Sequence, residues 1–66
     1  MSDYELATFF VHWLAYAIET DGVIGLVKAA EKVRAHSRFK GLPERVQGNI
    51  EGFIVGAAAV KEGYVR

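Results

Sequence analysis

Apolar residues recur at helical spacing along the last third of the chain. Successive members of the set are separated by four, three, four, three and four positions, which is the spacing of one packed helix face. The set consists of Val46, Ile50, Phe53, Ala57, Val60 and Tyr64. Pro43 precedes it and suits the first turn of a helix, where its missing N–H is not needed. The pattern predicts a helix over about residues 43–63.

The first third of the chain predicts another helix, over about residues 3–19. Ser2 and Glu5 have the spacing of a capping box, in which two side chains and two backbone N–H groups bond reciprocally at a helix start. The inward face repeats at four, three and four positions and carries Leu6, Phe10, Trp13 and Ala17.

Further apolar residues widen this face to an arc of about 220°, whereas packing against one layer needs about 100°. Phe9, Trp13 and Tyr16 are large side chains within the arc. A helix with this pattern is buried on two sides, and a chain of 66 residues cannot cover both. We expect a second subunit or a partner to contact Phe9, Trp13 and Tyr16.

A third helical pattern covers about residues 22–37, after the break at Thr20–Gly22. Its inward positions are Val23, Leu26, Val27, Ala30 and Val33. Residues 38–43 are expected to form a loop. Because no stretch alternates with period two, we expect no strand. The predicted fold is all-α: a single compact three-helix domain over residues 1–66, made of a helical hairpin and a third helix and completed by oligomerisation.

Three glycines in the last helix form a regular ridge. Gly48, Gly52 and Gly56 are four positions apart and lie about 115° from the apolar face of that helix. Each costs roughly 0.5–1 kcal/mol relative to alanine, so a close helix contact is expected to compensate, as in a glycine zipper. Either a helix of the same chain or a helix of another subunit could make that contact. Gly25 and Ala29 could supply a matching surface.

Composition describes a folded protein, since the chain is 52% hydrophobic and 24% charged. A domain this small is marginally stable without help. It has no cysteine, so disulfides and thiolate metal sites are excluded, and association remains as the source of stability. The longest unbroken apolar run has nine residues, whereas a membrane span needs about 20. The longer segment over residues 6–18 contains Thr8 and His12, and no basic segment of a signal peptide precedes it. We expect a soluble cytoplasmic protein with no membrane span.

The sequence contains no motif for catalysis. His12 has Thr8 and Tyr16 one turn away but no carboxylate within a turn, so neither a catalytic triad nor a metal site is indicated. Residues 41–48 lack the Lys-Ser/Thr ending of a phosphate loop. We expect no enzyme activity, no cofactor and no metal.

Charge is balanced overall, with eight basic and eight acidic residues, but it is segregated along the chain. A basic segment contributes Arg34, Arg38, Lys40 and Arg45, which we predict to converge on an anion or an acidic partner. Arg34 falls on the apolar stripe that contains Val23 and Val27. It is expected either to extend to solvent from the helix end or to form a bidentate pair with a carboxylate or a bound anion across a subunit or ligand interface.

These features favour a non-enzymatic interaction protein that self-associates, with a dimer preferred, and binds a protein partner. In size and helicity the chain resembles the small accessory proteins with which phages and mobile elements block host factors. The alternative is an oligomer that binds a small anionic ligand such as a nucleotide. DNA binding is disfavoured, because DNA-binding domains are usually basic and this chain has a pI of about 6.7.

Overall fold

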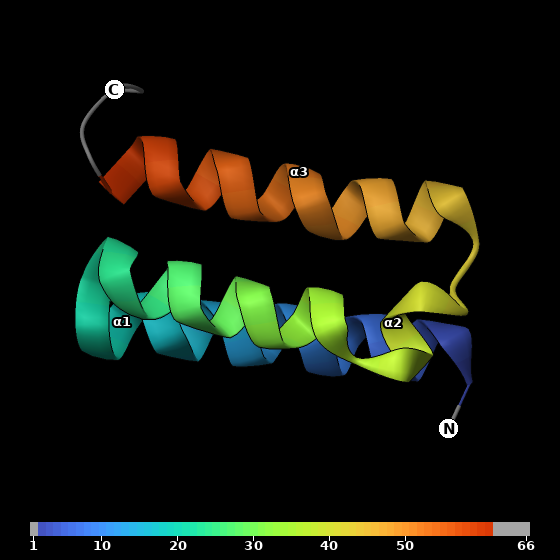
Figure 1. Ribbon diagram of the computed structural model, residues 1–66. Helices are drawn as coiled ribbons and strands as arrows, with labels where there is room; N and C mark the ends of the chain where they lie inside the picture. The colour runs from blue at the N-terminus through green and yellow to red at the C-terminus, as the bar shows by residue number, and fades with distance from the viewer. Residues whose placement is uncertain (1, 62–66) are drawn as a thin grey trace.

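The computed structural model describes residues 2–61, and all of its regular elements are helices. They are α1 (Asp3–Ala35), α2 (Ser37–Lys40) and α3 (Glu44–Lys61). Figure 1 shows that the chain reverses direction inside α1, so that its two halves lie side by side with α3 packed along them. The predicted all-α hairpin with a third helix is confirmed.

Gly22 makes the reversal within α1. Its φ of 68° and ψ of −154° lie outside the helical region, in a part of φ/ψ space that only glycine adopts without strain. Three residues later, a Cβ built on Gly25 would stand 2.5 Å from Asp21 Cβ and 2.6 Å from the Ala17 carbonyl oxygen. The two halves of α1 (residues 3–21 and 23–35) therefore approach each other closely because Gly25 has no side chain.

The start of α1 has the predicted capping box. The Ser2 hydroxyl accepts a hydrogen bond from the Glu5 backbone N–H at 3.1 Å, and the Glu5 carboxylate accepts one from the Ser2 N–H at 3.1 Å. The backbone and side-chain hydrogen bonds from Ser2 lower the pKa of Glu5. The local sequence signal thus specifies where this helix begins.

The core is formed by eleven buried apolar residues, and no polar side chain is buried among residues 2–61. They are Leu6, Phe10, Leu14, Leu26, Ala29, Ala30, Val33, Phe39, Leu42, Ile50 and Ile54. Two inward predictions are wrong, because Val27 is 50% exposed and Val60 is 61% exposed. In α1 the buried direction passes through Ala29 and Val33, and Val27 points about a third of a turn away from it.

The predicted loop over residues 38–43 is also wrong in part. Residues 38–40 belong to α2, and Phe39 and Leu42 are buried in the core. His36 caps α2 by accepting a hydrogen bond from the Arg38 N–H at its Nδ1, 3.1 Å away. Phe39 is buried with its ring edge-on to Phe10, at a centroid distance of 6.0 Å. The Gln47 amide donates to the Leu42 carbonyl oxygen at 2.8 Å, which ties this connection to α3. Tyr64, predicted on the inward face, lies outside the described residues.

Candidate interaction surfaces

The outward side of α3 carries an apolar surface of small residues, which we call the glycine face. It consists of Gly48, Gly52, Val55, Gly56 and Ala59. A Cβ added at any of its three glycines would have nothing within 4 Å outside the local helix backbone, and Val55 is 68% exposed. Of the two alternatives for the ridge, packing against a helix of the same chain is therefore wrong for the part of the chain that the structure describes. Gly25 and Ala29 are buried within the chain, so they cannot supply the matching surface either.

Val55 was not among the predicted contact residues, although the sequence indicates that it shares a helix side with the glycines. It follows Gly52 by three positions and Gly48 by seven, which places it on the same side of a helix.

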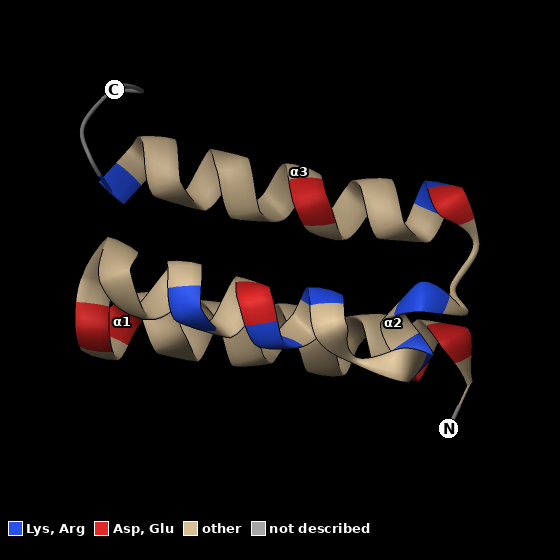
Figure 2. Ribbon diagram, in the orientation of Figure 1, with Lys and Arg blue, Asp and Glu red and all other residues tan. Residues whose placement is uncertain are grey.

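Charged residues are nearly absent from α3 between its two ends. Glu44 and Arg45 begin the helix, Lys61 ends it, and Glu51 is the one charged residue between them. Figure 2 shows this distribution as a long uncharged ribbon with a single acidic residue near its middle. Association along the glycine face would therefore bury little charge.

Glu51 is held by Arg34 on the side of α3 that faces α1. Arg34 Nε donates to Glu51 Oε2 at 2.8 Å, and Nη2 donates to Oε1 at 2.6 Å. These hydrogen bonds raise the pKa of Arg34 and lower the pKa of Glu51. A bidentate pair was one of the two predicted outcomes for Arg34, but it was expected across a subunit or ligand interface. It forms within the chain, and the Arg34 side chain is 46% exposed, so its placement on the buried stripe was wrong.

The rest of the basic segment lies on separate elements. Arg38 and Lys40 belong to α2 and are exposed, and Arg45 lies in the first turn of α3. Arg45 lines a groove between α1 and α3, whereas Arg34, Arg38 and Lys40 do not line it. The predicted anion site built from all four residues is therefore not supported as a single groove.

An aromatic surface lies on the first half of α1. Phe9 is 50% exposed and Tyr16 is 68% exposed, while Trp13 is half-buried. The Phe9 and Trp13 rings are in contact, with centroids 6.0 Å apart. With His12, these three side chains line a shallow depression. We define Phe9, His12, Trp13 and Tyr16 as the aromatic surface, and the chain leaves much of it open, as the wide apolar arc predicts.

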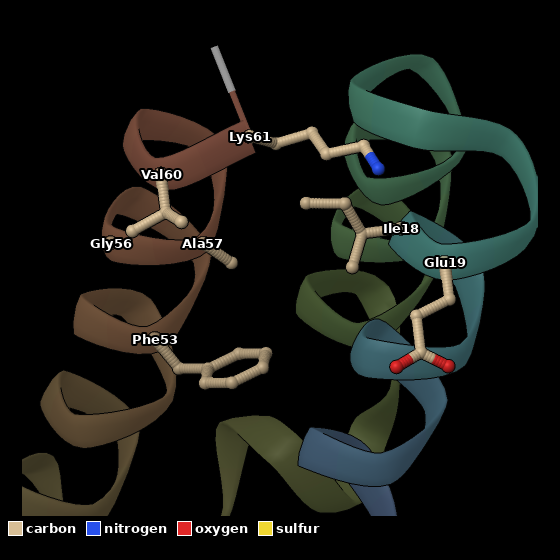
Figure 3. A pocket seen from close by; sticks show the side chains of 7 residues that line it. All are labelled: Ile18, Glu19, Phe53, Gly56, Ala57, Val60 and Lys61. Atoms are coloured by element: carbon tan, nitrogen blue, oxygen red, sulfur yellow. The ribbon is translucent and has the colours of Figure 1, made fainter. Parts of the chain in front are cut away.

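A second apolar groove, of about 480 Å³, lies between the end of the first half of α1 and the end of α3. Figure 3 shows the Ile18 side chain on the α1 side of this groove and the side chains of Phe53, Ala57 and Val60 on the α3 side. The Lys61 side chain extends from α3 toward α1. Gly56 lines this groove and also belongs to the glycine face. The apolar surface of α3 thus continues around the helix.

The described residues contain no group of three or more His, Cys, Asp or Glu placed to hold a metal ion. His12 is exposed, and the neighbouring Thr8 hydroxyl donates to the Tyr4 carbonyl oxygen at 2.9 Å. By length and composition alone, α1 is long and apolar enough to cross a membrane, and 22% of its most apolar window is buried inside the protein. A single helix of this kind is weak evidence for a membrane span, and this one reverses direction at Gly22.

Comparison with known proteins gives no relative. No family model matches the chain, and no curated protein and no solved structure shows a significant match. The evidence for function therefore comes from the surfaces of the chain itself.

Proposed function

We propose that this chain is a non-enzymatic helical interaction protein that forms a homodimer through the glycine face of α3 and binds a protein partner. The observation that carries the proposal is the open space at Gly48, Gly52 and Gly56. No contact among residues 2–61 requires glycine at these positions. Each of them nevertheless weakens α3 by roughly 0.5–1 kcal/mol relative to alanine.

A second helix laid on the glycine face would compensate for that cost. Glycine lets two backbones approach closely enough for dispersion and Cα–H···O contacts that larger side chains would prevent. A second copy of α3 is a suitable partner, because its surface is equally flat and uncharged and two such faces can meet about a two-fold axis. Glu51 borders the glycine face, three positions after Gly48 and four before Val55, but its charge is paired with Arg34.

The aromatic surface of α1 is the proposed site for the protein partner. Aromatic side chains contribute disproportionately to binding free energy at protein interfaces, and Phe9 and Tyr16 are at least half exposed. A cytoplasmic blocker of a host factor, of the kind that phages and mobile elements encode, would use such a surface. The alternative of a nucleotide site on the basic segment is weaker, because Arg34 is already paired with Glu51.

The mass of the protein in solution tests the dimer. We expect light scattering to give twice the chain mass of 7.3 kDa at micromolar concentrations. Gly52→Leu should give the mass of one chain while circular dichroism shows unchanged helicity, because the new side chain meets open space in its own subunit. Gly41→Ala is the matched control, since Gly41 lies in the connection before α3 and its added Cβ makes only ordinary contacts.

Two results would contradict the proposal. One is a wild-type protein that keeps the mass of a single chain up to high micromolar concentration. The other is a Gly52→Leu variant that remains dimeric and melts at a higher temperature, which would show that the glycine face is simply exposed helix surface.

A further inference from the structure

A groove between the beginnings of α1 and α3 differs from the other surfaces, because it combines an apolar floor with a polar rim. It encloses about 450 Å³, within the range of roughly 300–1,000 Å³ that small-molecule sites occupy. We call it the seam groove. Its lining residues are Tyr4, Ala7, Thr8, Val11 and His12 from α1 and Arg45, Val46, Asn49 and Ile50 from α3.

The floor of the seam groove is made by short aliphatic side chains. Ala7, Val11 and Val46 are half-buried at the edge of the core, and Ile50 is buried within it. Because Ala7 and Val11 are small, the first half of α1 leaves room beside α3. A flat apolar group of the size of an aromatic ring could remove this floor from water, which is favourable in proportion to the apolar area buried.

Three polar side chains on the rim have no partner inside the part of the chain that the structure describes. His12, Arg45 and Asn49 make no hydrogen bond or ion pair there. They supply an imidazole, a guanidinium and an amide around one opening. The Thr8 hydroxyl is already used, since it donates to the Tyr4 carbonyl oxygen.

Within residues 2–61, the positive charge of Arg45 is not cancelled by an ion pair with a carboxylate. Glu5 accepts the hydrogen bond of the capping box at Ser2, and Glu51 is paired with Arg34. Glu44 precedes Arg45 directly, and adjacent residues of a helix do not face each other. A guanidinium in this position is suited to a carboxylate, which its fork of N–H groups can bind with two parallel hydrogen bonds.

We propose that the seam groove binds a small aromatic carboxylate, with its ring on the aliphatic floor and its carboxylate on Arg45. Asn49 and His12 can donate further hydrogen bonds to the same anion. A single guanidinium beside an apolar floor fits one carboxylate better than the several charges of a nucleotide. The site uses one chain only, so it does not depend on the proposed dimer.

The probe for this site is 2-naphthoate, titrated into uniformly ¹⁵N-labelled protein while the amide resonances are followed by NMR. We expect saturable shifts at residues 7–12 and 45–50, with a Kd of about 1 mM for a ligand of this size. The uncharged analogue 2-naphthamide should bind about tenfold more weakly or less, because it cannot pair with a guanidinium.

Two variants separate the groove from general electrostatic attraction. Arg45→Ala should weaken binding of 2-naphthoate about tenfold or more. Lys40→Ala removes the same charge from the same basic segment, but Lys40 does not line the groove, so its Kd should stay within about twofold of wild type. Unchanged amide spectra away from the substitution would show that both variants are folded.

Several results would overturn the proposal. One is the absence of saturable shifts up to 10-fold above the expected Kd. Another is a set of saturable shifts confined to Trp13 and Tyr16 or to residues 52–59, which lie outside the seam groove. A third is equal affinity for 2-naphthoate and 2-naphthamide. Equal weakening by Arg45→Ala and Lys40→Ala would also overturn it, since it would reveal attraction to the basic segment as a whole. None of these results bears on the mass of the protein, which tests the dimer separately.

Discussion

Arg34 and Glu51 join the second half of α1 to α3 through two parallel hydrogen bonds, of 2.8 Å from Nε and 2.6 Å from Nη2. The side chains remain 46% and 39% exposed, so water and salt screen the pair and its contribution to stability is modest. The pair also determines where the Glu51 charge lies. The pair holds the single charge in the middle of α3 beside α1 and leaves the glycine face apolar.

Replacing Glu51 with glutamine should lower the free energy of unfolding by about 0.2–1 kcal/mol at neutral pH. The folded state lowers the pKa of Glu51 below its ordinary value of 4.5. The pair therefore adds stability above that value and loses it as the pH falls through the lower, folded-state pKa. Urea unfolding of wild type and Glu51→Gln at pH 7 and pH 3 should show the difference shrinking at the lower pH. A difference that grows on acidification would contradict this assignment.

Alanine at Gly48 should have opposite effects on the single chain and on the proposed dimer. In the single chain the new methyl group meets open space, so improved helix propensity should stabilise the fold by roughly 0.5–1 kcal/mol. In the dimer it should hold the two helices apart. We expect the melting temperature of wild type to rise with protein concentration and that of Gly48→Ala to rise less. Parallel concentration dependence in both proteins would place Gly48 outside the interface.

Gly22→Ala should destabilise the protein by about 1–3 kcal/mol, because a Cβ is strained at a φ of 68° and a ψ of −154°. The space around Gly22 is open, so the expected cost comes from the backbone conformation and not from a clash. Urea unfolding monitored by circular dichroism measures it. Gly41→Ala serves as the comparison, since Gly41 has a φ of −84° that alanine adopts easily, and it should change stability far less.

Phe9 and Phe10 are adjacent in sequence but should respond very differently to truncation. Phe10 is fully buried, whereas Phe9 is 50% exposed. Phe10→Ala should cost about 3–5 kcal/mol or prevent folding, as large-to-small changes in a core do. Phe9→Ala should cost clearly less and retain the helical spectrum. Thermal melts of the two variants would decide the matter, and similar losses in both would mean that Phe9 is covered in the folded protein.

Local signals in the sequence predicted the helices well. The Ser2–Glu5 spacing specified the start of α1, and Gly22 marked its reversal, because both features act through residues a few positions apart. The inward positions Leu6, Phe10 and Ile50 followed from periodicity alone.

Predictions that depended on the direction of a neighbouring helix were less successful. Val27 and Arg34 were placed inward because both fall on the apolar stripe formed by Val23, Leu26, Val27, Ala30 and Val33. The buried side of this segment instead includes Gly25 and Ala29, which lie away from Val27 and Arg34 around the helix. Burial of Phe39 was not predicted either, since it depends on the distant Phe10 ring against which it packs.

The candidate surfaces were only partly predictable for the same reason. Helical spacing was enough to predict the glycine ridge and the apolar side chains of Phe9, Trp13 and Tyr16. Whether other helices of the chain cover the ridge depends on where those helices lie, which spacing does not determine. Tyr4 and Asn49 joined the seam groove only because α1 and α3 lie side by side, a relationship that no local pattern records.

The reversal at Gly22 also determines the order in which the chain can acquire its contacts. The two halves of α1 are consecutive in sequence, so their pairing requires closure of only a tight turn. The whole second half of α1 separates α3 from the first half along the sequence, although the two pack together in the structure (Figure 1). Short loops close at a lower entropic cost than long ones, and helical proteins rich in local contacts fold in microseconds to milliseconds. We therefore expect the α1 hairpin to form early and α3 to dock onto it afterwards. A newly made chain would then complete the glycine face, the surface proposed for self-association, only once its own core is closed.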